Sequence, residues 1–200
     1  MTTFLLVRHA TGDHVGRRLA GRAPGTPLND AGRAEASRLA EWLAPVTLAA
    51  VYSSPLERAR DTAAVLAAPR GLNVTVDPAF TELDFGDWTG RSIDSLAGDP
   101  HWDRFNQFRS TTRPPRGELM VEAQARAVSG LAALAARHDG ETVAVVSHAD
   151  VLRSAIAHFA GAPLDLFLRF VIEPASVTTV ALHPWGAELL GLNASPEPPA

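Results

Sequence analysis

Five side chains in this sequence combine nucleophilic, acidic and cationic character. Arg8 and His9 are adjacent, Arg58 lies in a polar stretch, and Glu82 and His148 stand further along the chain. An unprotonated imidazole is a nucleophile or a base, and a carboxyl group donates or accepts a proton. Guanidinium groups bind phosphate through paired hydrogen bonds. Together these residue types favour a cationic site that binds a phosphate.

A series of strands would bring these side chains to one place. Apolar runs at 4–7, 49–53 and 142–146 and an alternating segment at 73–77 are typical of strands. Ligands of open α/β sheets bind beyond the carboxyl ends of the strands. The polar residues that follow these runs, and that we expect at one rim, are Arg8, His9, Ser53, Ser54, Glu82 and His148.

Helices are predicted between the strands, at about 30–43, 55–68 and 149–160. Asn29 or Asp30 can cap the first of them, because their short polar side chains accept hydrogen bonds from the first turn. The longest predicted helix runs from about Glu118 to His138, and its expected buried face comprises Val121, Ala125, Val128, Ala132 and Ala135.

The order of these elements predicts the fold. Strands at 176–182 and 188–192, with Gly186 at the turn, indicate a terminal antiparallel hairpin. Alternating strands and helices predict a three-layer α/β/α sandwich with a mainly parallel central sheet. We expect a single domain over residues 1–194 and a disordered tail at 195–200.

Composition limits the classes of protein that fit. With 200 residues and 46% hydrophobic residues, the chain can bury the core of one domain. The formal charge of −4 argues against a broad nucleic-acid surface, and the absence of cysteine excludes disulfides and thiolate chemistry. No targeting signal and no apolar stretch of the ~20 residues that a membrane span needs are present. We therefore expect a cytoplasmic protein with no membrane or nucleic-acid partner.

Five ordered segments resemble the motifs of one family. They are LVRHAT at 6–11, PLNDAGRAEA at 27–36, YSSPLERARDTA at 52–63, ELDFGDWTG at 82–90 and VVSHA at 145–149. The sequence is identified on these motifs as similar to the histidine phosphatase superfamily, whose fold is phosphoglycerate mutase-like. A single Arg-His pair would carry no weight, whereas five motifs in the family's order are specific.

The resemblance implies a phosphoryl transfer in two steps. His9 would be the nucleophile and would form a phosphohistidine. Arg8, Arg58 and His148 would hold the phosphate oxygens. Glu82 would protonate the leaving oxygen and then activate water, which requires a pKa above the ordinary ~4.3 of a glutamic acid. The resemblance implies neither a metal nor another cofactor, because the arginines take the place of a divalent cation.

Other polar residues have weaker assignments. In the loop that follows the first motif, we select His14 and Arg18 as substrate-binding residues, while Arg17 and Arg22 are expected in solvent. Asp84 is a rival to Glu82 as the acid.

The segment 91–117 is the predicted specificity segment. Trp102, Phe105 and Phe108 form an apolar stripe there that either packs on the core or forms a lid over the pocket. In the same segment, Arg113 or Arg116 could meet a second anionic group of the substrate.

Two departures from the family pattern bear on the carry-over of residue roles. Ala10 and Ala149 stand where glycine is commoner, which requires an ordinary backbone φ at both positions. The segment after His9 reads Thr-Gly-Asp-His instead of the family's Glu-x-x-x-Asn, so substrate contacts cannot be transferred to it directly.

Several functions fit these residues. The first is a phosphomonoester phosphatase acting on a small phosphorylated metabolite, and the second is a phosphoglycerate mutase or other phosphomutase. The superfamily's mutases have a longer segment in place of 91–117 and a longer C-terminal extension, so the phosphatase is favoured. A metal-dependent hydrolase, with His9, Asp13, His14 and His148 as ligands, and a non-catalytic phospholigand-binding module are further alternatives. A homodimer stays open.

Overall fold

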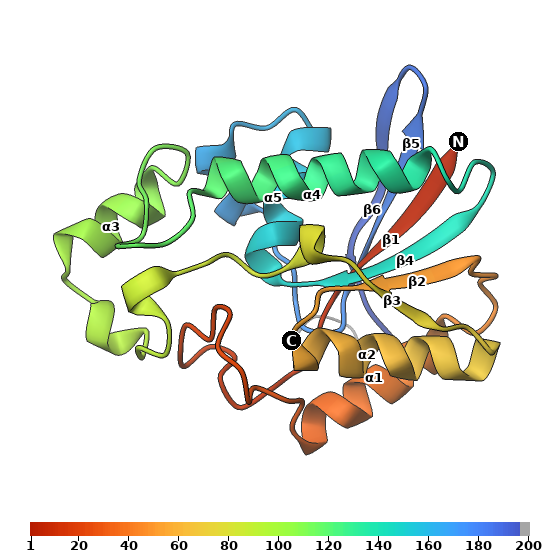
Figure 1. Ribbon diagram of the computed structural model, residues 1–200, viewed down its shortest axis with the longest axis horizontal. Helices are drawn as coiled ribbons and strands as arrows, with labels where there is room; N and C mark the ends of the chain where they lie inside the picture. The colour runs from red at the N-terminus through yellow and green to blue at the C-terminus, as the bar shows by residue number, and fades with distance from the viewer. Residues whose placement is uncertain (197–200) are drawn as a thin grey trace.

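One mixed β-sheet forms the centre of the molecule. The computed structural model describes residues 1–196, and within them the strand order is β3-β2-β4-β1-β5-β6 (Figure 1). The first four of these strands are parallel, whereas β5 runs antiparallel to both β1 and β6. The strands are β1 (Thr2–Arg8), β2 (Ala50–Ser53), β3 (Val74–Val76), β4 (Thr142–Ser147), β5 (Val177–His183) and β6 (Gly186–Ala194).

Helices cover both faces of this sheet, as Figure 1 shows. The α-helices are α1 (Asp30–Trp42), α2 (Glu57–Ala67), α3 (Pro100–Gln107), α4 (Met120–Ala135) and α5 (Ala149–Phe159). Short 3-10 helices lie at Ala68–Arg70, Pro78–Phe80, Gly86–Trp88, Asp94–Leu96 and Leu164–Arg169. No helix in the described part of the chain is both long and apolar enough to cross a membrane.

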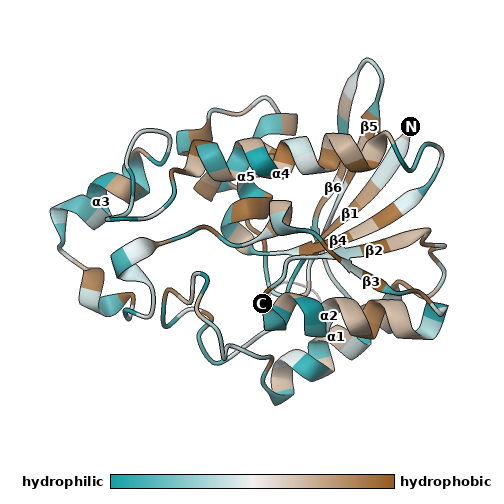
Figure 2. Ribbon diagram, in the orientation of Figure 1, coloured by the Kyte–Doolittle hydropathy of each residue, from teal (hydrophilic) through white to brown (hydrophobic). Residues whose placement is uncertain are grey.

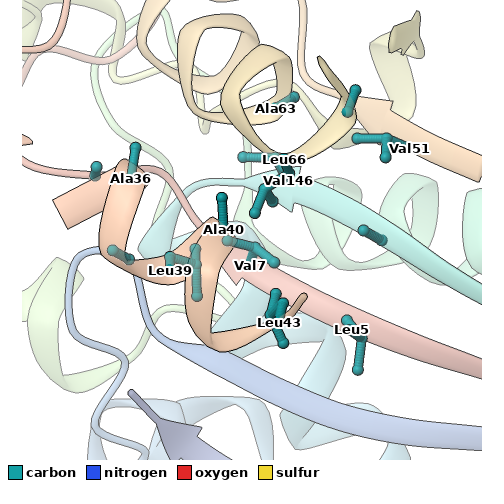
Figure 3. Packing of buried hydrophobic residues seen from close by; sticks show 14 of the residues in the cluster. Leu5, Val7, Ala36, Leu39, Ala40, Leu43, Val51, Ala63, Leu66 and Val146 are labelled. Atoms are coloured by element: carbon teal, nitrogen blue, oxygen red, sulfur yellow. The ribbon is translucent and has the colours of Figure 1, made fainter. Parts of the chain in front are cut away.

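Alternation along β1 builds two separate cores, because successive side chains of a strand point to opposite faces. Leu5 and Val7 pack with α1 and α2, as Figure 3 shows for the cluster around Leu39 and Leu66. Phe4 and Leu6 pack on the other face, with α4 and α5. In Figure 2 hydrophobic and hydrophilic residues alternate along these helices, as expected for helices with one buried face. The predicted α/β/α sandwich is confirmed.

The start of α1 is fixed against the loop that follows β1. Asn29 caps the helix, and its Oδ1 accepts the backbone N–H of Gly32 at 2.9 Å. Glu35, one turn later, accepts hydrogen bonds from the backbone N–H and the hydroxyl of Thr11, both at 2.8 Å. The helix therefore holds the chain just beyond Arg8 and His9.

Some predicted elements differ from the observed ones. The buried face of α4 consists of Met120, Ala123, Ala127, Leu131 and Leu134, whereas Val121 is exposed. The predicted face is confirmed only at Val128 and Ala135, which are partly buried against the core. Ala125 and Ala132 are exposed, because the larger leucines and Met120 point to the core. The strand predicted at 73–77 is only three residues long, and α2 begins at Glu57, two residues after Pro55. Of the tail predicted at 195–200, residues 197–200 lie outside the described residues.

The segment 91–117 forms a small layer beside the main sandwich. It contains α3, and its Phe105 side chain is fully buried in a third apolar cluster with Trp88. Trp102 is half-buried against both rings, with ring centroids at 5.7 Å from Phe105 and 5.3 Å from Trp88. Phe108 is exposed. The predicted apolar stripe therefore packs on this cluster through two of its three residues.

Candidate active site

The carboxyl ends of β1, β2 and β4 lie side by side and present polar residues at one rim. His9 follows β1, and its backbone N–H donates to the carbonyl of Ser147 at 2.9 Å. Ser54 follows β2, and its N–H donates to the carbonyl of Val146 at 2.9 Å. His148 directly follows β4. The structure thus brings together the strand-end residues that the sequence places at this rim.

The hydrogen bonds of His9 determine which ring nitrogen is free. Nδ1 is 2.8 Å from the carbonyl oxygen of Ala10, which can only accept, so Nδ1 carries the proton. Nε2 therefore has a lone pair, and Arg58 Nε donates to it at 3.3 Å. Burial lowers the pKa of His9 well below its ordinary value, and the Arg58 cation adds to this effect. The imidazole is neutral near pH 7, as a nucleophile requires.

Arg58 is a cation that is almost completely removed from solvent, with 1% of its surface exposed. Besides His9, its guanidinium donates to the hydroxyl of Thr26 at 2.7 Å and to the carbonyl of Gly21 at 2.9 Å. All three acceptors are neutral, and no carboxylate within residues 1–196 forms an ion pair with it. A buried charge is costly unless a counter-ion compensates it. This arrangement therefore suits an anion next to His9.

His148 lies between His9 and Glu82. Its ring centroid is 5.1 Å from that of His9, and its Nε2 forms a hydrogen bond of 2.7 Å with the hydroxyl of Ser54. Its Nδ1 is buried without a hydrogen-bond partner and lies 3.9 Å from a carboxylate oxygen of Glu82. Burial, and then the charge of Arg58, lowers the pKa of His148 well below its ordinary value.

The Glu82 carboxyl group has the properties of an acid that works near neutral pH. Its side chain is 12% exposed, and one oxygen accepts the backbone N–H of Leu83 at 2.8 Å. Burial, followed by the negative charge of Asp150, raises its pKa to about 7, against the opposing effect of Arg58. A substantial fraction of Glu82 is therefore protonated at neutral pH.

Two arginines hold the backbone of Glu82. Arg22 Nε donates to its carbonyl oxygen at 2.8 Å, and Arg126 donates to the same oxygen at 3.3 Å. Glu118 accepts hydrogen bonds from both arginines, at 2.9 and 2.8 Å. Arg22 is exposed, as predicted for its loop, and its guanidinium also helps to hold the acid motif, because the loop folds back onto it.

A cavity of about 200 Å³ opens beside His9. The ring of His14 lies 5.7 Å from that of His9, and burial lowers the pKa of His14 to about 4. Arg8 also lines the cavity, while one of its guanidinium nitrogens donates to the carbonyl of Ile172 at 2.6 Å. The sequence-predicted residues that line this cavity are Arg8, His9, His14, Arg18, Arg58 and Glu82.

Three other predicted candidates lie away from the cavity. The Asp84 carboxylate accepts a backbone N–H of its own turn at 2.9 Å, so it is not positioned as the acid. Arg113 forms a salt bridge with Glu122 on α4 at 2.7 Å, and Arg116 pairs with Asp87. Neither arginine is available at the cavity for a second anionic group.

Sequence reasoning missed four residues around the site. Asp150 lines the cavity together with Phe85 and Ile93. Arg109, from the segment 91–117, is buried against Asp150 at 2.8 Å. Asp150 could have been found, because it stands two residues after His148 in the first turn of the predicted helix. Nothing in the local sequence distinguishes Arg109 from the neighbouring exposed arginines.

The arrangement of side chains does not favour a metal site. Within residues 1–196, no three histidine, aspartate or glutamate side chains gather so that they could hold a metal ion. Asp13, proposed above as a ligand, accepts a hydrogen bond from the Asn29 amide at 2.9 Å instead. The geometry is that of an anion site built from arginine and histidine.

Comparison with known proteins shows the family of this chain. The family model described as histidine phosphatase superfamily (branch 1) matches residues 4–195. The chain belongs to the histidine phosphatase superfamily. The five motifs identified in the sequence therefore fall within one family domain, and its fold is phosphoglycerate mutase-like.

Relatives in the superfamily include phosphatases. Bifunctional protein Rv2228c of Mycobacterium tuberculosis is 34% identical over 91% of this chain, which spans only about half (47%) of that protein. Phosphoserine phosphatase 1 of Hydrogenobacter thermophilus is 29% identical over 96% of this chain and 92% of its own. The solved structure of the mycobacterial glucosyl-3-phosphoglycerate phosphatase Rv2419c, in complex with VO3, is 30% identical, with a TM-score of 0.88 over 96% of this chain and 99% of that chain.

This histidine phosphatase superfamily member departs from the usual glycines of its motifs without strain. Neither Ala10 nor Ala149 has a positive φ, so an alanine side chain is accommodated at both positions. The prediction of ordinary backbone geometry there is confirmed.

Proposed function

We propose that this protein is a phosphomonoester hydrolase that acts on a small phosphorylated metabolite through a phosphohistidine intermediate. The observation that carries the proposal is the environment of His9. Its Nε2 lone pair faces Arg58, a buried cation without a carboxylate partner among the described residues, and the Glu82 acid lies on the same cavity. A phosphate placed there would meet a nucleophile, its counter-charge and a proton donor.

In the first step, Nε2 of His9 attacks phosphorus, and the phosphorus–oxygen bond to the leaving group breaks. Glu82 gives its proton to the leaving oxygen, so the product departs as an alcohol. Arg8 and Arg58 balance the charge on the phosphate oxygens. His148 Nδ1, which has no hydrogen-bond partner among the described residues, would contact one of these oxygens.

In the second step, the Glu82 carboxylate takes a proton from water as the water oxygen attacks phosphorus. The bond between phosphorus and Nε2 breaks, and inorganic phosphate leaves. His9 regains its lone pair, and Glu82 is protonated again. His14 and Arg18, on the wall of the cavity, would contact the organic part of the substrate.

Hydrolysis is favoured over mutase activity by the dimensions of the specificity segment. A mutase must keep water away from its phosphohistidine, and the superfamily's mutases do so with a longer segment. Here the segment 91–117 packs on its own aromatic cluster and contributes only Ile93 to the cavity wall. Relatives of both kinds match this chain: phosphoserine phosphatase 1 and Rv2419c are named phosphatases, and GpmB of Escherichia fergusonii, 30% identical over 90% of this chain, is named a probable phosphoglycerate mutase.

The test is phosphate release from p-nitrophenyl phosphate and a panel of natural phosphomonoesters, with and without EDTA. We expect turnover that resists EDTA, is inhibited by vanadate and is abolished by His9→Ala. Wild type quenched with denaturant at alkaline pH should keep its bound phosphoryl group in alkali and lose it on acidification, as a phosphohistidine does. Turnover that collapses with EDTA would contradict the proposal, and transfer of the phosphoryl group to a product without phosphate release would identify a mutase.

A further inference from the structure

Two carboxylates line the cavity, and their partners differ. Asp150, in the first turn of α5, accepts hydrogen bonds from Arg109 at 2.8 Å and from Arg153 at 3.3 Å. The Glu82 carboxylate contacts the backbone N–H of Leu83, and no arginine of the described chain lies within ion-pair distance of it. Two acids in one cavity with such different partners will take different protonation states.

Arg109 is buried and is held by two aromatic rings and by hydrogen bonds of its terminal nitrogens. It is 4% exposed, and its guanidinium lies 3.9 Å from the ring centroid of Phe105 and 5.0 Å from that of Phe167. A further nitrogen donates to the side-chain oxygen of Asn106 at 2.8 Å. A guanidinium does not lose its proton in proteins, so Arg109 is a fixed positive charge beside Asp150.

This fixed charge determines the state of Asp150. Burial opposes ionisation of Asp150, but Arg109 and Arg153 outweigh it and lower the pKa of the carboxyl group. Asp150 is therefore an anion throughout the neutral range. Its charge faces a cavity in which a second negative carboxylate is unfavourable.

On the basis of the function proposed above, we propose that Asp150 is a positioning residue for the acid step. Its permanent negative charge adds to the effect of burial and favours the protonated form of the Glu82 carboxyl group until the leaving oxygen takes the proton, and Arg109 anchors that charge. The segment 91–117 thereby affects the acid step through the buried side chain of Arg109, which holds Asp150.

The other charges around Glu82 do not reverse this effect. The cations Arg58 and Arg126 favour its ionised form, but they are outweighed by burial and by Asp150, and the pKa of Glu82 rises to about 7. The charged and titratable groups that face Glu82 from the surrounding elements are Arg8, Arg22, Arg58, Arg109, Arg126, His148 and Asp150.

The pH dependence of kcat/KM tests the proposal, with glycerol 2-phosphate as a substrate whose leaving group needs a proton. Activity should fall on the alkaline side as the free Glu82 ionises. Asp150→Asn removes the negative charge and keeps the shape, so this limb should move to lower pH by about one unit. If the alkaline limb of the Asp150→Asn profile stays at the wild-type pH, the proposal is overturned.

Asp165→Asn is the matched control. The Asp165 carboxylate also anchors the segment 91–117, since it accepts hydrogen bonds from the backbone N–H and hydroxyl of Ser110 at 2.7 and 2.8 Å. It does not line the cavity. The control variant should therefore keep the wild-type pH profile. An equal shift in both variants would assign the effect to loosening of the segment and overturn the role of Asp150.

A second variant and a second measurement make the test independent of folding defects and of turnover. Asp150→Asn leaves Arg109 without its partner, so the double variant Arg109→Met/Asp150→Asn removes both charges together. The Glu82 carboxyl carbon can be titrated by NMR in protein labelled at glutamate, with Glu82→Gln for assignment. A lower Glu82 pKa in both variants supports the proposal and an unchanged one overturns it. Absence of wild-type turnover would contradict the proposed function alone.

Discussion

At the scale of single residues, the site depends on which groups are kept neutral. The imidazole of His9 is neutral because burial and Arg58 oppose its protonation, and the Ala10 carbonyl selects the tautomer with a free Nε2. Glu82 is kept partly protonated by burial and by Asp150. A neutral nucleophile and a neutral acid therefore face the same cationic phosphate site, which is the combination that phosphoryl transfer to histidine needs.

Glu82→Gln should separate the two steps of the reaction. Glutamine can keep the hydrogen bond from Leu83 but can neither protonate an alkoxide nor activate water. With glycerol 2-phosphate we expect kcat/KM to fall about 10²–10⁴-fold. With p-nitrophenyl phosphate, whose leaving group departs without a proton, the phosphohistidine should still form and then persist. Stopped-flow measurement should show a burst of one p-nitrophenolate per active site.

Asp84→Asn is the control for this prediction, because Asp84 lies two residues away and its carboxylate is outside the cavity. It should keep steady-state turnover within a few-fold of wild type. A burst in Asp84→Asn, together with normal turnover in Glu82→Gln, would show that Asp84 is the acid and contradict the assignment to Glu82.

At the scale of the elements, the first helix positions the nucleophile by contact with the loop beyond it. A Cβ at Gly32, in the first turn of α1, would lie 1.9 Å from the carbonyl oxygen of Thr11. Glycine lets the helix approach the backbone of this loop closely, so that Glu35 can accept both hydrogen bonds of Thr11. The motif at 27–36 therefore serves catalysis by packing and contributes no side chain to the cavity.

Gly32→Ala should consequently reduce both stability and activity. The added methyl group displaces backbone that cannot move away as a flexible side chain would, so we expect a loss of about 1–3 kcal/mol in the free energy of unfolding. Urea denaturation measures this loss, and the displaced His9 loop should lower kcat. Gly191→Ala is the control, since a Cβ there meets nothing within 4 Å and φ is not positive. Equal stability of the two variants would contradict the packing argument.

The elements also show how far sequence reasoning extends. The strand ends at His9 and His148 were predictable, because a residue following an apolar run of a parallel sheet must lie at the ligand-binding rim. The face of α4 was not, since alanine and valine repeat on two sides of that helix and only packing selects Leu131 and Leu134. Arg109 was unpredictable for a similar reason: its burial comes from Phe105 and from residues far away in the chain.

At the scale of the whole molecule, the titratable residues of the site lower the free energy of unfolding at acidic pH. The pKa values of His9 and His148 are well below 6.5 in the folded state, and that of His14 is about 4. Below pH 6.5 the unfolded chain therefore binds more protons at these residues, and stability falls with acidification. Glu82 acts in the opposite direction: its folded pKa of about 7 exceeds 4.5, so between these values the folded state binds the extra proton. Three histidines against one glutamate leave a net loss of stability on acidification.

This balance predicts the pH dependence of unfolding. Between pH 6 and 5 the unfolded chain binds about two more protons than the folded protein, which lowers the free energy of unfolding by about 2–3 kcal/mol per pH unit. Urea denaturation across this range measures the slope. His9→Ala removes one of the three histidines and should flatten the slope, whereas His158→Gln, at an exposed position, should leave it as in wild type. A wild-type slope retained in His9→Ala would mean that His9 is not held neutral by the fold, and the nucleophile would then need a proton acceptor of its own before it could attack phosphorus.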